Sequence, residues 1–93
     1  MRNETEPETE TVCRVCGFSG EVFWEGGWPT EAICLCCGNE SDVGDASVMG
    51  LRGYRGYWVG HGAPWHSPSE ERKQKRQGWD LLKQLAAIPP EWR

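Results

Sequence analysis

Five cysteines are the residues of this 93-residue chain with the clearest potential for chemistry. Four of them form two Cys-x-x-Cys pairs, each followed directly by a glycine, and 17 residues separate the pairs. Each such turn places two sulfurs on one side of an ion, and two turns complete the tetrahedron of thiolates that Zn²⁺ prefers. This spacing is typical of zinc ribbons and related folds. The sequence therefore predicts one structural zinc ion with four ligands, Cys13, Cys16, Cys34 and Cys37.

Several alternatives to this ligand set remain open. Similar cysteine pairs bind a single iron ion in rubredoxin-like electron carriers, so iron is the rival metal. The spacing favours Cys34 and Cys37 as the second pair and leaves Cys36 as a buried small hydrophobe or a reactive thiol. His61 and His66 can replace a cysteine ligand in principle, but with four cysteines in place we expect them to be turn residues. Four thiolates leave no open position for water, so the sequence argues against an enzyme.

Composition indicates where such a site must fold. An odd number of cysteines argues against a closed set of disulfides. Residues 1–11 are acidic and contain no apolar run, so we expect no secretory signal and a disordered leader. No later apolar stretch approaches the roughly 20 residues that span a bilayer. We therefore expect a reduced, cytoplasmic protein with one zinc-stabilised domain over residues 12–93.

The predicted fold class is a small α+β metal-bound domain, with a zinc-ribbon-like hairpin followed by two or three short helices. Residues 22–24 and 31–35 are expected to be short strands, turned back by glycines and a proline between them. This hairpin, within residues 12–39, brings the two cysteine turns together. Residues 39–47 form an acidic loop.

Residues 48–88 form the Trp-rich helical part. Apolar residues recur at i, i+3, i+7 and i+8 over 48–59, where Leu51, Tyr54, Trp58 and Val59 mark one helical face. Three glycines inside this helix are expected to allow close packing against a neighbouring segment. Ser67, Pro68 and Glu70 predict a second helix start with a capping box. Asp80 is expected to cap a third helix, which the prolines at 89–90 end.

The second cysteine turn, Cys34-Leu-Cys-Cys37-Gly38 with an acidic loop after it, resembles the family of small cysteine-rich bacterial proteins named for a Cys-Pro-Cys-Cys motif. Leu35 stands where that family has proline, and the acidic loop is thinner than usual. The resemblance implies a zinc-binding protein without established catalysis. Such genes often lie beside toxin or defence genes, so the resemblance also implies an immunity or antitoxin-like protein whose partner is a protein such as a toxin. It covers residues 12–88 and further matches Tyr54-Arg55 with Trp58, Gly62-Ala63-Pro64-Trp65, and Trp79-Asp80 with Gln84-Leu85.

We therefore expect a non-enzymatic, zinc-binding protein-interaction module that presents an acidic, Trp-rich face. Tryptophan and tyrosine are common hot spots of binding. The expected partner contacts are Trp28, Tyr57, Trp65, Glu40, Asp42 and Asp45. The alternative role of the tryptophans is structural: Trp24, Trp58, Trp65 and Trp79 would then form the core.

The alternative function is that of a zinc-ribbon nucleic-acid-binding or regulatory protein. The basic run 72–76 supplies charge, and Arg52, Tyr54, Arg55 and Tyr57 add charge and stacking groups. The formal charge of the chain is −4, and residues 1–11 contribute three of these negative charges. Residues 12–93 are thus near neutral and lack the basic surplus expected of a dedicated nucleic-acid binder.

Overall fold

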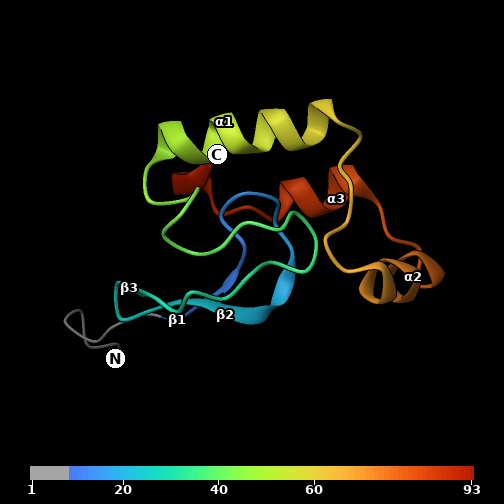
Figure 1. Ribbon diagram of the computed structural model, residues 1–93, viewed down its shortest axis with the longest axis horizontal. Helices are drawn as coiled ribbons and strands as arrows, with labels where there is room; N and C mark the ends of the chain where they lie inside the picture. Colours follow the sequence, from blue (N-terminus) through green and yellow to red (C-terminus); the bar gives the residue numbers. More distant parts are fainter. Residues whose placement is uncertain (1–8) are drawn as a thin grey trace.

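The computed structural model describes residues 9–93, so residues 1–8 of the predicted leader lie outside the described residues. A small antiparallel sheet lies at one side of the molecule, α1 lies at the opposite side, and the cysteine turns lie between them (Figure 1). The predicted α+β class is confirmed. The described elements are β1 (Thr9–Val12), β2 (Ser19–Glu25), β3 (Trp28–Pro29), α1 (Val48–Gly60), α2 (Pro68–Arg76), α3 (Leu81–Ala86) and the 3₁₀ helix η1 (Pro90–Trp92).

The sheet has the order β1-β2-β3, which differs from the predicted hairpin. The main partner of β2 is β1, with Glu10 opposite Trp24, so the prediction that residues 9–11 belong to a disordered leader is wrong. Residues 31–35 form no strand and contribute only one isolated bridge, between Ile33 and Glu40. The left-handed backbone of Glu31, with φ of 65°, ends the pairing of β3 after two residues.

The helices begin at the predicted residues. Ser67 Oγ accepts the backbone N–H of Glu70 at 3.2 Å, and Asp80 Oδ1 accepts that of Leu82 at 2.9 Å. The predicted capping box is wrong in its second half, because Glu70 accepts a bond from Gln74 and the N–H of Ser67 is bonded to Leu35 O. None of the described helices is long and apolar enough to cross a membrane.

Of the three glycines predicted to allow close packing of α1, only Gly50 has close neighbours: a Cβ atom there would lie 3.0 Å from Ser47 Oγ and 3.7 Å from Gly44 O. A Cβ atom at Gly53 or Gly56 would meet open space, so these two residues allow no close packing. The apolar residues of α1 do pack inward, and Leu51 and Trp58 are buried.

The core surrounds the cysteines. The buried cluster contains all five cysteines together with Phe23, Leu51 and two of the tryptophans, Trp24 and Trp58. Trp65 and Trp79 are partly buried and pack against it. Two of the four tryptophans expected in the structural alternative thus belong to the core, and the other two lie at its edge.

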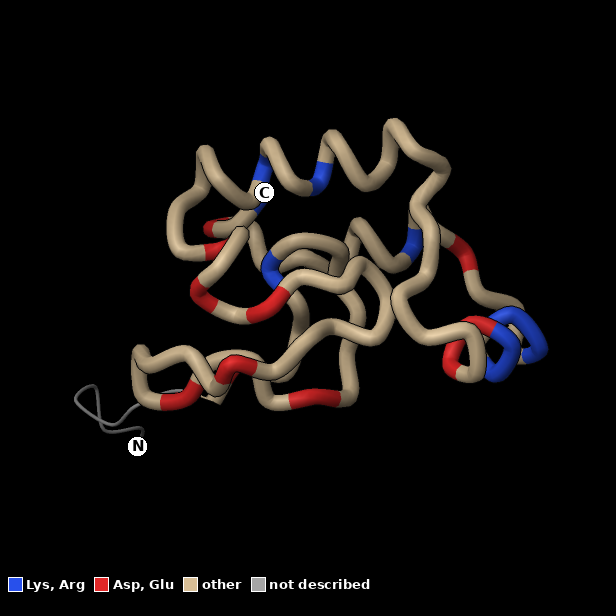
Figure 2. The backbone as a smooth tube through the Cα atoms, in the orientation of Figure 1, with Lys and Arg blue, Asp and Glu red and all other residues tan. Residues whose placement is uncertain are grey.

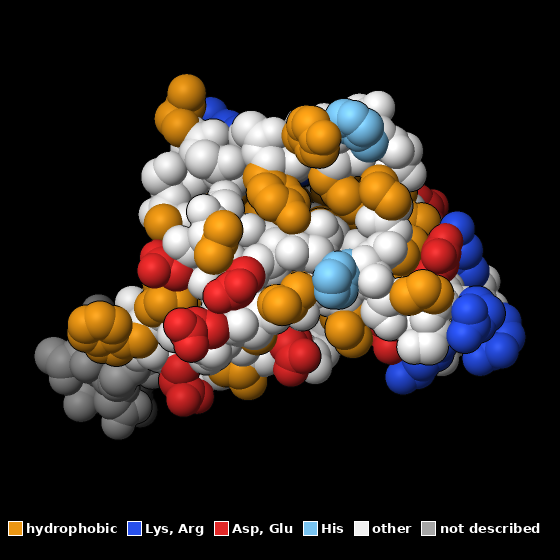
Figure 3. All heavy atoms as spheres, viewed as in Figure 1, with side chains coloured by type: hydrophobic (Ala, Val, Ile, Leu, Met, Phe, Trp, Pro, Cys, Tyr) orange, Lys and Arg blue, Asp and Glu red, His pale blue; other side chains and the backbone are white. Residues whose placement is uncertain are grey.

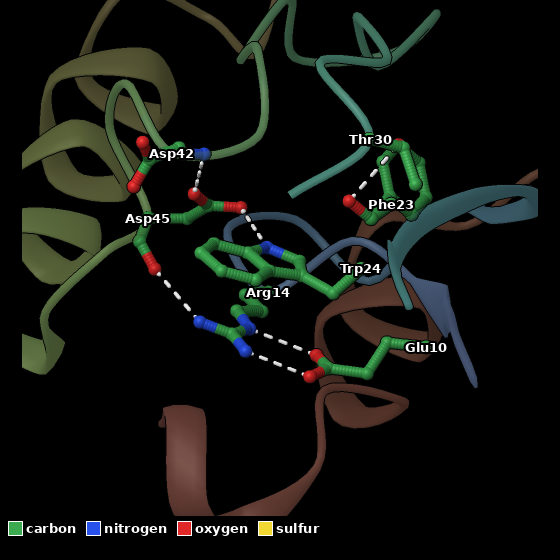
Figure 4. A network of polar contacts seen from close by, with 7 residues as sticks. All are labelled: Glu10, Arg14, Phe23, Trp24, Thr30, Asp42 and Asp45. Carbon is green, nitrogen blue, oxygen red and sulfur yellow. Dashed lines mark hydrogen bonds and ion pairs between the residues drawn. The ribbon is translucent and has the colours of Figure 1, made fainter. Parts of the chain in front are cut away.

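Arg14, the residue after Cys13, joins several segments to this core. Its guanidinium carbon lies 3.9 Å from the ring centre of Trp24 and 3.8 Å from that of Trp92. Two of its nitrogens bind the carboxylate of Glu10 at 2.8 and 2.7 Å, and the third donates to Asp45 O at 3.1 Å (Figure 4). One buried cation thus connects β1, β2, the loop before α1 and the C-terminal turn.

Candidate metal centre

The two Cys-x-x-Cys-Gly segments fold into the same backbone turn. In the first, Gly17 N–H donates to Cys13 O at 2.9 Å, and in the second, Gly38 N–H donates to Cys34 O at the same distance. Both glycines have left-handed backbones, with φ of 87° and 79°. Glycine enters this region without the steric cost of a Cβ atom, which explains the residue after each pair. We call these turns the first knuckle (residues 13–18) and the second knuckle (residues 34–39).

The knuckles bring the four predicted ligands together. Their four Sγ atoms all lie within 4.8 Å of one another, and all four residues are buried. The Sγ atoms of Cys13 and Cys37 are 3.7 Å apart, and those of Cys16 and Cys34 are 3.6 Å apart. Sulfurs on a tetrahedron with a metal–sulfur distance of about 2.3 Å lie about 3.8 Å apart. The four cysteines are therefore positioned to hold a metal ion.

The protonation of the cluster depends on such an ion. Burial raises the pKa of Cys16 well above its usual value, and contact with Cys13 raises the pKa of Cys37. Contact with Cys13 lowers the pKa of Cys34. Without a cation, the buried sulfurs thus hold protons on some members and stabilise a thiolate on another. A metal ion must displace these protons when it binds.

The first knuckle is covered by α1 and the C-terminal segment. Arg55 donates to Val15 O at 2.6 Å and to Trp92 O at 2.7 Å. Gln84 donates its amide to Cys16 O at 3.2 Å. A Cβ atom at Gly17 would overlap the backbone carbonyl oxygen of Gln84, so α3 packs directly on this knuckle.

The second knuckle is held by residues of α1 and of the segment that follows it. The hydroxyl of Tyr54 donates to Cys37 O at 3.1 Å. The backbone N–H of His66 donates to Cys36 O at 2.9 Å. Burial, followed by the charge of Cys37, raises the pKa of Tyr54, which keeps this hydroxyl protonated as a donor.

Cys36 and the two histidines lie outside the ligand set. Cys36 is fully buried, and its sulfur accepts a hydrogen bond from Gln84 Nε2 at 3.3 Å. Contact with Cys16 lowers the pKa of Cys36. His61 Nδ1 lies 2.7 Å from Tyr57 O, and the His66 ring lies against Gly38. Neither histidine belongs to the cluster that the four cysteines form.

The predicted partner contacts differ in how far they are exposed. Trp28, on β3, is 76% exposed, and Tyr57, on α1, is 71% exposed. Trp65 is partly buried, with its ring edge-on to Phe18 and Trp79. Asp42 is exposed and Glu40 is partly buried.

Asp45 is only 1% exposed, so the prediction of an accessible carboxylate at this position is wrong. Its two oxygens accept hydrogen bonds from Trp24 Nε1 at 3.0 Å and from the backbone N–H of Asp42 at 2.7 Å (Figure 4). These two bonds satisfy the carboxylate inside the fold, where an unpaired one would be costly.

A groove beside the second knuckle collects residues that the sequence analysis did not combine. Its volume is about 310 Å³, and hydrophobic side chains and both histidines lie on this face of the molecule (Figure 3). Tyr54, Tyr57, Trp58 and His61 follow the i, i+3, i+4, i+7 spacing of one helical face, a signal that the sequence did contain. The lining residues are Cys37, Tyr54, Tyr57, Trp58, His61, Pro64, Trp65 and His66.

Comparisons with family models, with curated proteins and with solved structures find no match to this chain. The resemblance to the Cys-Pro-Cys-Cys family therefore stays a prediction.

Proposed function

We propose that this domain is a non-enzymatic protein-interaction module stabilised by one structural Zn²⁺ ion, bound by Cys13, Cys16, Cys34 and Cys37. The observation that carries the proposal is the buried shell of four sulfurs at near-tetrahedral separations. Soft thiolates suit zinc and iron, and they do not suit magnesium or calcium. Zinc in such a shell supplies structural cross-linking, since no position is left for water or substrate.

The way the helices are attached supports a structural role. Direct side-chain hydrogen bonds join Tyr54 of α1 to the second knuckle, and they join Arg55 of α1 and Gln84 of α3 to the first. Both helices are therefore attached directly to the knuckles. If the knuckles separate, both helices lose their support, so metal binding and folding are expected to be one event.

Metal analysis of the reduced, purified protein tests the structural part. We expect one equivalent of zinc, a colourless solution, and loss of the cooperative thermal transition when a strong chelator removes the ion. A red protein with one equivalent of iron would show that iron, the rival metal, occupies the site instead of zinc. A metal-free protein that melts cooperatively in chelator would contradict the proposal.

The interaction part is supported by the exposed aromatic residues. Tyr57 is 71% exposed, and it borders a groove that Cys37 of the candidate metal centre also lines. Large aromatic residues at a groove are typical anchors of protein interfaces. We expect a Tyr57→Ala variant, used as bait in a lysate of the native host, to lose a partner that the unaltered protein retains. The Leu82→Ala variant is the matched control, because Leu82 is 75% exposed, lies outside the groove and is not a predicted partner contact.

Nucleic-acid binding is the second candidate, and one observation favours it. The last turns of α2 carry Lys73, Lys75 and Arg76, and Figure 2 shows the basic residues gathered at that end of the molecule. The arginines of α1 do not extend this patch, because Arg52 donates to Arg93 O and Arg55 donates to Val15 O. Retention on heparin that falls with salt would support this candidate, and passage through the column at low salt would contradict it.

A further inference from the structure

The groove beside the second knuckle is lined by aromatic rings and by hydrogen-bond acceptors. Tyr54, Tyr57, Trp58 and Trp65 supply the rings. Aromatic faces are negative and attract cations placed over them. The groove is small for a cofactor site, since its 310 Å³ is at the lower end of ligand pockets, and it has room for one long side chain of a partner.

The histidine of α1 adds an acceptor. A carbonyl oxygen only accepts hydrogen bonds, so the 2.7 Å contact between His61 Nδ1 and Tyr57 O requires Nδ1 to carry the proton. With Nδ1 as the donor, Nε2 is the ring nitrogen that can accept a hydrogen bond, and the ring packs on Tyr57 with 4.1 Å between ring centres. The indole N–H of Trp65 is a donor, but its nitrogen is buried and has no hydrogen-bond partner among the described residues.

The proposed metal centre is the source of negative charge next to the groove. Cys37 is both a metal ligand and a lining residue, and four thiolates with one divalent ion carry a formal charge of −2. None of the groove's lining residues, all within the described part of the chain, is lysine, arginine, aspartate or glutamate. On the face in Figure 3, most of the acidic side chains lie to one side of the histidines, and most of the basic side chains lie to the other side, over α2.

We propose that this groove binds an arginine side chain of a partner protein. A guanidinium group has five N–H donors and no acceptor, it is flat, and it stacks on aromatic rings. These properties complement a groove with ring faces, an imidazole acceptor and a nearby anionic metal centre. Lysine offers the charge without the flat face and should bind more weakly. The inference rests on the proposed interaction module and specifies what its partner presents.

Two blocked pentapeptides test the proposal on the zinc-loaded full chain: Gly-Gly-Arg-Gly-Gly and the same peptide with citrulline, the neutral isostere of arginine. Binding is followed through the indole N–H signals of the six tryptophans in nuclear magnetic resonance spectra. We expect the arginine peptide to shift the signals of Trp58 and Trp65, and to bind at least fivefold more tightly than the citrulline peptide. Higher salt should weaken this binding.

Variants at Tyr57 locate the site, because its exposed ring can be removed without damage to the core. Tyr57→Ala should weaken the arginine peptide at least fivefold, and Tyr57→Phe, which keeps the ring, less than twofold. Leu82→Ala, at an exposed position outside the groove, should leave binding unchanged. Equal binding of the two peptides, equal binding of a Gly-Gly-Pro-Gly-Gly peptide, or shifts confined to Trp28 and Trp92 would overturn the proposal. Absence of binding to protein with stoichiometric zinc, or a groove-dependent partner without arginine at its interface, would also refute it and leave the interaction module standing.

Discussion

The two knuckles have the same backbone geometry and lie in different surroundings. The first knuckle is buried along its length, and the two residues between its cysteines, Arg14 and Val15, are 6% and 0% exposed. In the second knuckle the equivalent residues are Leu35, which is half-buried, and Cys36. The C-terminal segment covers the first, and the second borders the aromatic groove.

The two knuckles therefore contribute equally as metal ligands and differently to the packing of the fold. Each knuckle gives two sulfurs to the same site, so removal of any ligand should have the same effect. The residues around the sulfurs differ between the knuckles. Those of the first knuckle connect distant parts of the chain, while one side of the second knuckle borders the groove. Paired substitutions at equivalent positions can therefore test the comparison.

Loss of a ligand is the largest expected effect, and it should abolish the difference between the knuckles. We expect Cys16→Ser and Cys34→Ser alike to lose stoichiometric metal and the cooperative transition, because structural zinc contributes about 10–16 kcal/mol in small zinc-binding peptides. Metal content and circular dichroism measure both effects. Cys36→Ser is the control and should retain one equivalent of metal. Retention of metal by one ligand variant alone would show that the two knuckles contribute unequally to the site.

The second expected effect concerns the first residue after each leading cysteine. Arg14→Ala removes a buried cation from between two tryptophans and leaves the carboxylate of Glu10 without its partner. We expect it to lower the free energy of unfolding by about 3–5 kcal/mol while metal stoichiometry is kept. Leu35→Ala, at the equivalent position, should cost about 1–2 kcal/mol, because the side chain is only half-buried. Urea unfolding at a fixed zinc concentration compares the two, and equal costs would contradict the asymmetry.

The glycine after each pair gives a third comparison. Both glycines need a left-handed backbone, which costs an alanine about 1–2 kcal/mol. At Gly17 a Cβ atom would also overlap Gln84 O and displace α3, so we expect Gly17→Ala to cost about 2–4 kcal/mol in all.

A Cβ atom at Gly38 would lie 3.3 Å from its nearest neighbour, Nδ1 of the His66 side chain, and this ring can move. Gly38→Ala should therefore cost little more than the backbone strain, about 1–2 kcal/mol. Denaturant midpoints of the two variants, measured side by side, decide the matter. A larger loss for Gly38→Ala would show that the second knuckle is the more tightly packed one.

Local patterns made the ligands and helix starts predictable from the sequence. The spacing of the cysteines, the glycine after each pair, and the caps at Ser67 and Asp80 are constraints within a few residues, and the structure keeps all of them. The helical side of the aromatic groove could also have been predicted from the sequence, since four of its lining residues share one helical face: Tyr54, Tyr57, Trp58 and His61.

Features that depend on distant partners were not predictable. The sequence predicts an acidic leader that includes residues 9–11, yet these residues belong to β1 and pair with β2. Glu10 of this strand binds a buried arginine. Asp45 reads as solvated, yet the indole N–H of Trp24, 21 residues away in sequence, holds its carboxylate inside the fold. In both cases a polar residue became structural because a partner far along the chain satisfied it.

The smallest expected effect tests the link between α1 and the second knuckle. Tyr54→Phe removes the hydroxyl that donates to Cys37 O and leaves this carbonyl without that donor. We expect the variant to lower the free energy of unfolding by about 1 kcal/mol with zinc content unchanged. Tyr57→Phe removes an equivalent hydroxyl from the exposed ring one turn later, so it should leave stability within about 0.5 kcal/mol of the unaltered protein. Identical unfolding curves for both variants would mean that Tyr54 holds the second knuckle by the packing of its ring and that the hydrogen bond contributes nothing measurable.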